Sequence, residues 1–185
     1  TPFSLDISKH IIDHKIDILI RVKDISDSSY HLTGKQRLKR GGIWYTPQSG
    51  IWQTVWVESM PKIYLKELTI IPKFDEKQVA FHFDLSVKHE VSVVIYANDV
   101  KIASKTTMQQ TMVMDIDSFY PWTPEQPFLY TIKIKVNDDT IDSYVGMRKF
   151  SRHVDRDGIM RFYLNNEPYF LTGVLDQGYY SDGLL

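Results

Sequence analysis

Residues 78–87 read Q-V-A-F-H-F-D-L-S-V, with an apolar side chain at every second position. The apolar set is Val79, Phe81, Phe83, Leu85 and Val87. Successive side chains of a strand point to opposite faces, so this period of two is typical of a strand with one buried face. Residues 128–136 repeat the pattern. There the apolar face is formed by Tyr130, Ile132, Ile134 and Val136. Both stretches are therefore predicted to be half-buried antiparallel strands.

Similar β-like runs surround these two stretches at the intervals expected of a sandwich. The predicted strands are residues 63–71, 78–87, 91–97, 101–104, 111–116, 128–136 and 140–150. Turn-forming sequences separate them, such as N-D at 98–99 and N-D-D at 137–139. No segment of useful length has a helical period. The pattern predicts an all-β fold with an immunoglobulin-like β-sandwich at its centre.

The N-terminal part also carries β-like runs, at residues 3–7, 16–22 and 51–58. Between the last two, residues 24–40 are polar and rich in turn formers, which predicts a long surface loop. The basic end of this loop is interpreted as a solvated run, because Asp24 and Asp27 lie close in sequence.

Composition narrows the possible partners. The 22 Lys and Arg residues nearly balance the 23 Asp and Glu residues, so the sequence predicts neither nucleic-acid binding nor a basic membrane patch. No apolar run approaches the roughly 20 residues needed to span a bilayer. The absence of cysteine excludes disulfides and thiolate metal sites but leaves the compartment open, with the cytoplasm slightly preferred. His10 and His14 lack a third ligand at metal-binding spacing, so no metal or cofactor is expected.

Three tryptophans and one tyrosine lie within residues 40–57, which read R-G-G-I-W-Y-T-P-Q-S-G-I-W-Q-T-V-W-V. Such rings can stack on the apolar faces of sugars, or they can fill a core, where tryptophan is usually well buried. Within this stretch, S-G-I-W-Q-T-V-W at 49–56 resembles the S-G-I motif that closes the sugar-binding domain of family 2 glycoside hydrolases. That family includes β-galactosidases, β-glucuronidases and β-mannosidases.

Three more stretches resemble the same family, in the family's order. Residues 120–130, Y-P-W-T-P-E-Q-P-F-L-Y, resemble a motif of its middle domain, which implies structural roles for Tyr120, Trp122, Glu125 and Tyr130. An acid role for Glu125 is the alternative. Residues 142–150, D-S-Y-V-G-M-R-K-F, resemble the last sandwich strand.

The fourth stretch, L-N-N-E-P-Y at 164–169, resembles the hairpin that plugs the base of the family's (β/α)₈ barrel. Its Asn165-Asn166 pair suits a tight turn with positive φ. The resemblance then makes residues 169–175 the first barrel strand.

The resemblance divides the chain into three successive pieces. Residues 1–59 would be the C-terminal strands of a jelly-roll sugar-binding domain, 60–152 the complete sandwich, and 153–185 the start of a truncated catalytic barrel. The flanking strands would then lack their usual partners, so they are expected to pair with each other, with the sandwich or with a second copy of the chain. Of these outcomes, a homo-oligomer formed through the exposed flanks is preferred.

The chemistry that the resemblance implies is hydrolysis of a terminal β-glycosidic bond with retention, most readily a β-galactosidase. Family 2 enzymes use two barrel glutamates about 5 Å apart. None of this chain's glutamates lies in a matching motif, so the catalytic residues are expected beyond residue 185 and the chain alone is expected to be inactive. The alternative is a free-standing, non-catalytic sandwich that binds carbohydrate or protein.

What the chain could supply is the rim of the sugar pocket. The predicted rim residues are Trp44, Tyr45, Gln48, Asp176 and Gln177. Trp44 stands where several family members have a substrate-binding aspartate, and G-V-L-D-Q-G at 173–178 replaces their G-x-x-R-H-E. Asp176 and Gln177 follow the first barrel strand, on the face where such barrels carry function. Both departures leave the particular sugar open.

Overall fold

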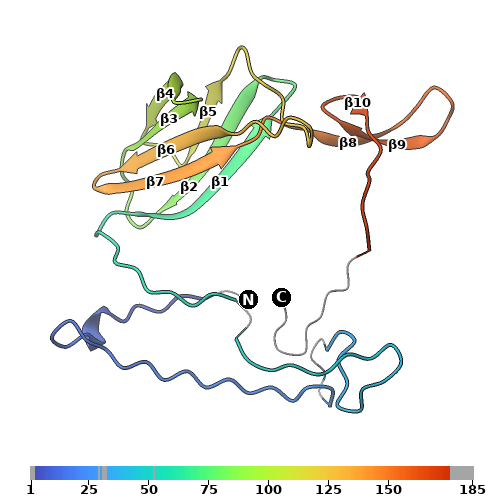
Figure 1. Ribbon diagram of the computed structural model, residues 1–185. Helices are drawn as coiled ribbons and strands as arrows, with labels where there is room; N and C mark the ends of the chain where they lie inside the picture. Colours follow the sequence, from blue (N-terminus) through green and yellow to red (C-terminus); the bar gives the residue numbers. More distant parts are fainter. Residues whose placement is uncertain (1–2, 29, 31–32, 52, 176–185) are drawn as a thin grey trace. The chain divides into compact units, whose positions relative to one another are not determined.

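The computed structural model describes residues 3–28, 30, 33–51 and 53–175. The chain divides into two compact units, of which the second spans residues 57–173 and the first contains the residues on either side of it (Figure 1). Among the described residues the one helix is η1 (Ser8–His10), so no described helix is long enough to cross a membrane.

The second unit contains the predicted β-sandwich. One sheet has the strand order β1-β2-β5 and the other the order β4-β3-β6-β7, all antiparallel (Figure 1). The strands are β1 (Leu65–Lys73), β2 (Gln78–Leu85), β3 (Val91–Ala97), β4 (Val100–Thr107), β5 (Thr111–Asp115), β6 (Tyr130–Val136) and β7 (Asp139–Val145). The all-β sandwich prediction is confirmed, and its seven strands begin and end within a few residues of the predicted runs.

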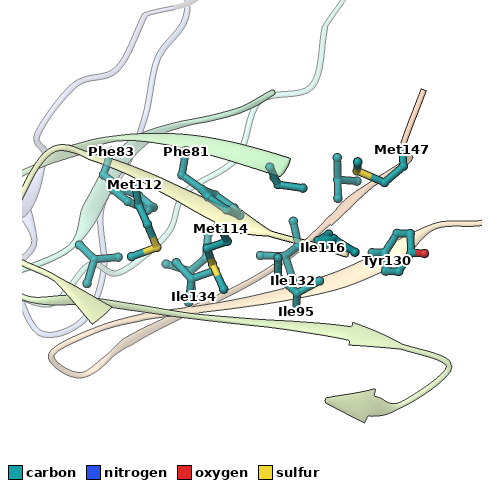
Figure 2. Packing of buried hydrophobic residues seen from close by; sticks show 14 of the residues in the cluster. Phe81, Phe83, Ile95, Met112, Met114, Ile116, Tyr130, Ile132, Ile134 and Met147 are labelled. Carbon is teal, nitrogen blue, oxygen red and sulfur yellow. The ribbon is translucent and has the colours of Figure 1, made fainter. Parts of the chain in front are cut away.

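The core lies between the two sheets and follows the alternation of the sequence. Every second side chain of β2, β3 and β6 is buried, and the row of β2 faces the rows of β3 and β6 across the sandwich (Figure 2). The largest fully buried side chains include Phe83, Ile95, Ile132, Ile134 and Tyr130. Each such side chain stabilises the fold by about 1.5–3 kcal/mol relative to an exposed position.

Two-residue turns connect neighbouring strands where the sequence places Asn and Asp. Asn98 and Asp99 have φ values of 47° and 66° between β3 and β4, and Asn137 has 53° between β6 and β7. Asn and Asp tolerate this left-handed region better than other non-glycine residues. The turns therefore fix the register that keeps the apolar rows inside.

Single side chains connect the two sheets at their edges. The Asp139 carboxylate on β7 accepts a hydrogen bond of 3.0 Å from the Leu65 backbone N–H at the start of β1. On the opposite side, the Lys105 ammonium of β4 donates to the Val113 carbonyl of β5 at 2.9 Å. Lys105 lies opposite the buried Val93 in the β3–β4 register, so its side chain starts on the inner face of this sheet. From there it extends to the other sheet.

A third, small sheet follows the sandwich, with the order β10-β9-β8 (Figure 1). Its strands are β8 (Phe150–Val154), β9 (Met160–Leu164) and β10 (Glu167–Pro168). The strand predicted over 140–150 ends at Val145 as β7, and the next strand, β8, begins at Phe150. The predicted Asn165-Asn166 turn is confirmed, with φ values of 53° and 70° between β9 and β10.

The strands predicted at residues 3–7, 16–22, 51–58 and 169–175 are not formed in the described residues, and Trp52 lies outside them. The Tyr169 N–H donates to the Phe162 carbonyl of β9 at 2.9 Å, but in the described residues these segments form no strand ladder. Most of their apolar side chains are consequently exposed, as Ile18 at 54% and Trp56 at 70% illustrate. A period of two identifies a strand-forming sequence, and a strand also needs a partner.

We expect the full chain to associate through its N-terminal unit, because exposed apolar segments with unpaired backbone groups template intermolecular contacts. Light scattering on the full chain and on a shortened chain of residues 57–173 checks this. The full chain should form oligomers and the shortened chain should be a monomer. Two monomers, or equal oligomer fractions in both, would contradict the prediction.

Candidate functional site

The first candidate region is the loop that carries Trp44, Tyr45 and Gln48. Its backbone is held against the preceding segment, since the Tyr45 N–H donates to the Lys35 carbonyl at 2.8 Å and the Arg37 N–H donates to the Tyr45 carbonyl at 3.1 Å. A tight turn precedes Trp44, whose N–H donates to the Gly41 carbonyl at 3.1 Å. The structure thus gives the aromatic pair a defined backbone.

Cationic side chains lie over both rings of this loop. The Arg37 guanidinium lies 4.6 Å from the Trp44 ring centre, and the Lys35 ammonium lies 6.0 Å from that of Tyr45. Trp44 is 38% exposed. A sugar that stacked on the face covered by Arg37 would have to displace the guanidinium, a contact that contributes about 0.5–1 kcal/mol at an exposed site.

Gln48 is fixed through its backbone. Its N–H donates to the side-chain carbonyl of Gln36 at 2.8 Å. The acidic residues of the same unit also bind the loop, because the Asp27 carboxylate accepts from the Leu38 N–H and the Asp24 carboxylate from the Ser49 hydroxyl. The structure therefore brings Trp44, Tyr45 and Gln48 together on one loop. Asp176 and Gln177 lie outside the described residues.

The second candidate region is the connection before β6, where Tyr120 and Tyr130 form a corner. The Tyr130 hydroxyl accepts a 2.7 Å hydrogen bond from the Tyr120 backbone N–H. Tyr130 is buried in the core, and this burial raises the pKa of its phenol. The contact fixes the start of β6, in agreement with the structural role that the resemblance implies for both tyrosines.

Trp122 is packed between the sandwich and the segment that follows β7. The backbone N–H of Trp122 donates to the Met147 carbonyl at 2.9 Å. The Arg148 guanidinium stacks on the indole, 4.5 Å from the ring centre. Gly146 allows this approach, because a Cβ there would lie only 3.1 Å from the indole ring. The indole position therefore depends on a residue without a side chain at 146.

Asn165, in the turn of the small sheet, connects that sheet to the corner. Its side-chain amide donates to the Trp122 carbonyl at 3.0 Å, and its side-chain oxygen accepts from the Lys149 N–H at 3.0 Å. Its own N–H donates to the Lys149 carbonyl at 2.8 Å. One partly buried side chain therefore satisfies backbone groups of two separate segments.

Asp75, in the turn between β1 and β2, holds the same small sheet from another side. Its carboxylate accepts from the Asn166 amide at 2.8 Å and forms an ion pair with the Lys149 ammonium. These two hydrogen bonds, the one from Asn166 first, lower the pKa of the Asp75 carboxyl. The sandwich and the small sheet are thus joined through Asn165 and Asp75.

Glu125 also contributes to this junction. The Tyr169 hydroxyl donates to its carboxylate at 3.1 Å. Hydrogen bonds from its own backbone N–H, from Thr123 and from Tyr169 lower the pKa of the Glu125 carboxyl. A carboxyl that is held ionised is poorly suited to act as a general acid near neutral pH. The geometry favours the structural role over the acid role.

Sequence reasoning recognised Asn165-Asn166 as a turn and missed its side-chain contacts, and it gave no role to Asp75 or Arg148. The signal for Asn165 was weak, because an asparagine in such a turn is explained by its backbone alone. In the described ranges no group of three His, Cys, Asp or Glu residues is placed to hold a metal ion.

Comparison with known proteins adds three findings. Residues 63–148 match the family model described as glycosyl hydrolases family 2. A curated relative from Formosa agariphila, described as a putative beta-glucuronidase, is 26% identical over 189 residues, which cover 92% of this chain and 22% of the relative.

A solved β-glucuronidase from Ruminococcus gnavus in complex with D-glucuronic acid is similar with a TM-score of 0.53 and 16% identity over 62% of this chain and 20% of that chain. Its apo structure gives a TM-score of 0.52, with the same identity and coverage. The chain spans about a fifth of the length of the relatives it matches.

Replacement of Asn165 by glycine is expected to lower the free energy of unfolding by about 1–3 kcal/mol, because partly buried backbone groups lose their partners. Glycine keeps the positive φ, so the substitution removes only the side chain. Asn137→Gly is the matched control, since Asn137 has the same φ and, within the described residues, its side chain is hydrogen-bonded only to the exposed Asp138 carboxylate. Urea denaturation should show little change for the control, and equal losses in both variants would contradict the role of Asn165.

The junction should also weaken in acid. The pKa of Asp75 is lowered in the folded chain, so its ionised form stabilises the fold above the unfolded pKa of about 3.9. This contribution is lost as the pH falls through the folded pKa. Below about pH 4, the unfolding free energy of the unmodified chain should therefore fall relative to that of Asp75→Asn. Parallel pH profiles of the two chains would contradict this.

Proposed function

We propose that the chain, whose residues 63–148 match the family model of glycosyl hydrolases family 2, is part of a retaining β-glycosidase of this family that hydrolyses terminal β-linked sugars. The observation that carries the proposal is the family match, which covers all seven strands of the sandwich. The curated relative, aligned over 92% of this chain, extends the similarity to both flanks.

Retaining glycosidases need two carboxyl groups about 5–5.5 Å apart, one as the acid/base and one as the nucleophile. In our proposal another part of the protein supplies both. The glutamates of this chain are Glu58, Glu67, Glu76, Glu90, Glu125 and Glu167. Glu125 has a lowered pKa and is bonded to Tyr169, which supports a structural role for it.

The proposed role of residues 60–152 is to support the catalytic part of the enzyme. The corner at Trp122 and the turn at Asn165 connect the sandwich to the hairpin β9–β10, after which the chain continues into residues 169–175. In this proposal, that segment leads into the catalytic barrel. The rigid junction would keep the barrel entrance at a fixed orientation to the sandwich.

The loop with Trp44, Tyr45 and Gln48 is proposed to form part of the sugar-pocket rim, together with Asp176 and Gln177. The partial exposure of Trp44 supports this role. Arg37, which stacks on Trp44, adds a cation to the loop. A cation beside the pocket would suit a substrate that carries a carboxylate.

For the sugar itself, we favour a β-glucuronide over the β-galactoside that the sequence first suggested. The curated relative is described as a putative beta-glucuronidase, and the two structures compared above are β-glucuronidases. The basic side chains Lys35 and Arg37 beside the aromatic pair are compatible with a uronic acid.

The 185-residue chain alone is expected to show no turnover of the nitrophenyl β-glucuronide, β-galactoside or β-mannoside, because the catalytic carboxylates are proposed to lie elsewhere in the protein. A colorimetric assay against a mock preparation checks this. Activity that disappears when one of the chain's own glutamates is changed to glutamine would refute the assignment of catalysis to another part.

Trp44→Ala, made in the longer protein that contains this chain, is expected to raise KM about fivefold to thirtyfold, the equivalent of about 1–2 kcal/mol of lost stacking. The melting temperature should hardly change. Trp56→Ala is the control, because Trp56 is also exposed but lies outside the 35–49 loop. A large fall in melting temperature with unchanged kinetics would instead identify Trp44 as a core residue.

A further inference from the structure

The outer face of the four-stranded sheet carries one row of side chains that crosses all four strands. Tyr144 on β7 pairs with Thr131 on β6, Thr131 pairs with Tyr96 on β3, and Tyr96 pairs with Lys101 on β4. The four strands lie side by side in this order in Figure 1. The row therefore reads aromatic ring, hydroxyl, aromatic ring, ammonium.

The alternation of the strands places this row outside the core. Tyr96, Thr131 and Tyr144 each have a buried chain neighbour. These neighbours are Ile95, Ile132 and Val145, respectively, so the three row residues lie on the opposite, outer face. Tyr144 is 68% exposed. Neither phenol takes part in a hydrogen bond or ring contact within the described part of the chain.

The spacing of the two phenols suits an oligosaccharide. Neighbouring strands lie about 4.8 Å apart, so rings on β7 and β3 are separated by roughly 10 Å. That separation is comparable to the length of a disaccharide. Thr131 lies between the rings, where its hydroxyl can donate to or accept from a sugar hydroxyl.

The charge of this face favours an anionic ligand. Three lysines lie on it, and the one carboxylate among the paired outer residues, Asp142, is bonded to Lys133 at 3.0 Å. Asp99, in the adjacent turn, and the Tyr96 phenol also act on Lys133. Lys101 and Lys135 form no ion pair in the described residues. Lys101 ends the row and is therefore available to a carboxylate.

We propose that this row, Tyr96, Lys101, Thr131 and Tyr144, is a non-catalytic binding site for an acidic oligosaccharide. One sugar ring stacks on each phenol, the Thr131 hydroxyl bonds between them, and the Lys101 ammonium pairs with a uronic-acid carboxylate. The binding site is separate from the proposed rim residues and requires no hydrolysis. Only the choice of uronic acids as the sugar class rests on the proposed function.

Isothermal titration of the full chain with a hexasaccharide of β-linked glucuronic acid tests the proposal, with the neutral β-linked glucose hexasaccharide as the comparison ligand. The acidic ligand should bind more tightly. Tyr144→Ala and Tyr96→Ala should each weaken its binding about tenfold, the size of one aromatic stacking contact. Lys101→Ala should remove the preference for the acidic ligand.

Matched variants separate this site from other causes. Tyr144→Phe keeps the ring and should retain binding, while Lys88→Ala removes an exposed lysine away from the row and should change nothing. Trp56→Ala, at an exposed ring outside both the row and the 35–49 loop, should also leave the affinity unaltered. Tyr144 is largely exposed, so Tyr144→Ala remains informative if the half-buried Tyr96 proves necessary for folding.

Absence of binding, or binding that survives Tyr144→Ala, would overturn the proposal. Binding lost with Trp44→Ala instead would assign the ligand to the rim loop and equally overturn it. Equal affinity for the acidic and neutral ligands would exclude the Lys101 contact. A failure of the proposed glycosidase activity would leave these outcomes unaffected, because none of them depends on turnover.

Discussion

Hydrogen bonding between neighbouring strands decides which parts of this chain form regular structure. Within residues 65–145 every strand has a partner, and alternate side chains can be buried because the partner fixes which face points inward. Residues 16–22 also alternate, apart from Leu19, but they have no strand partner among the described residues, and most of their side chains remain exposed. An apolar pattern alone does not make a sheet.

The sandwich and the small sheet that follows it are joined by polar contacts rather than by a shared apolar core. Asn165 satisfies backbone groups of Trp122 and Lys149, and Asp75 binds Asn166 and Lys149. Such contacts are directional, so they fix an angle that apolar packing leaves freer. Stacking of Arg148 between Trp122 and Phe150 adds an aromatic contribution to the same junction.

The sandwich could be predicted from the sequence because its information is local. The alternation at 78–87 and 128–136 identifies the buried faces, and the asparagines at 98, 137 and 165 identify the turns. The contacts of Asp75 could not be predicted, since its partner Asn166 lies 91 positions away. The break of the predicted strand at residues 146–149 was missed for a similar reason, because Gly146 is explained by the indole of Trp122. The stacking of Arg37 on Trp44 could not be predicted either, because the order of residues 37–44 does not determine which side chains meet.

Lys105 also affects how the sandwich can associate with other molecules. The free edge of β5 would otherwise offer a carbonyl to any strand of another molecule, and successive additions of that kind produce linear polymers. Because the Lys105 ammonium already occupies the Val113 carbonyl, an incoming strand would have to displace a charged hydrogen bond before it could pair. The Lys105 contact therefore protects the β5 edge against successive strand addition, so this edge does not promote polymerisation even at high protein concentration.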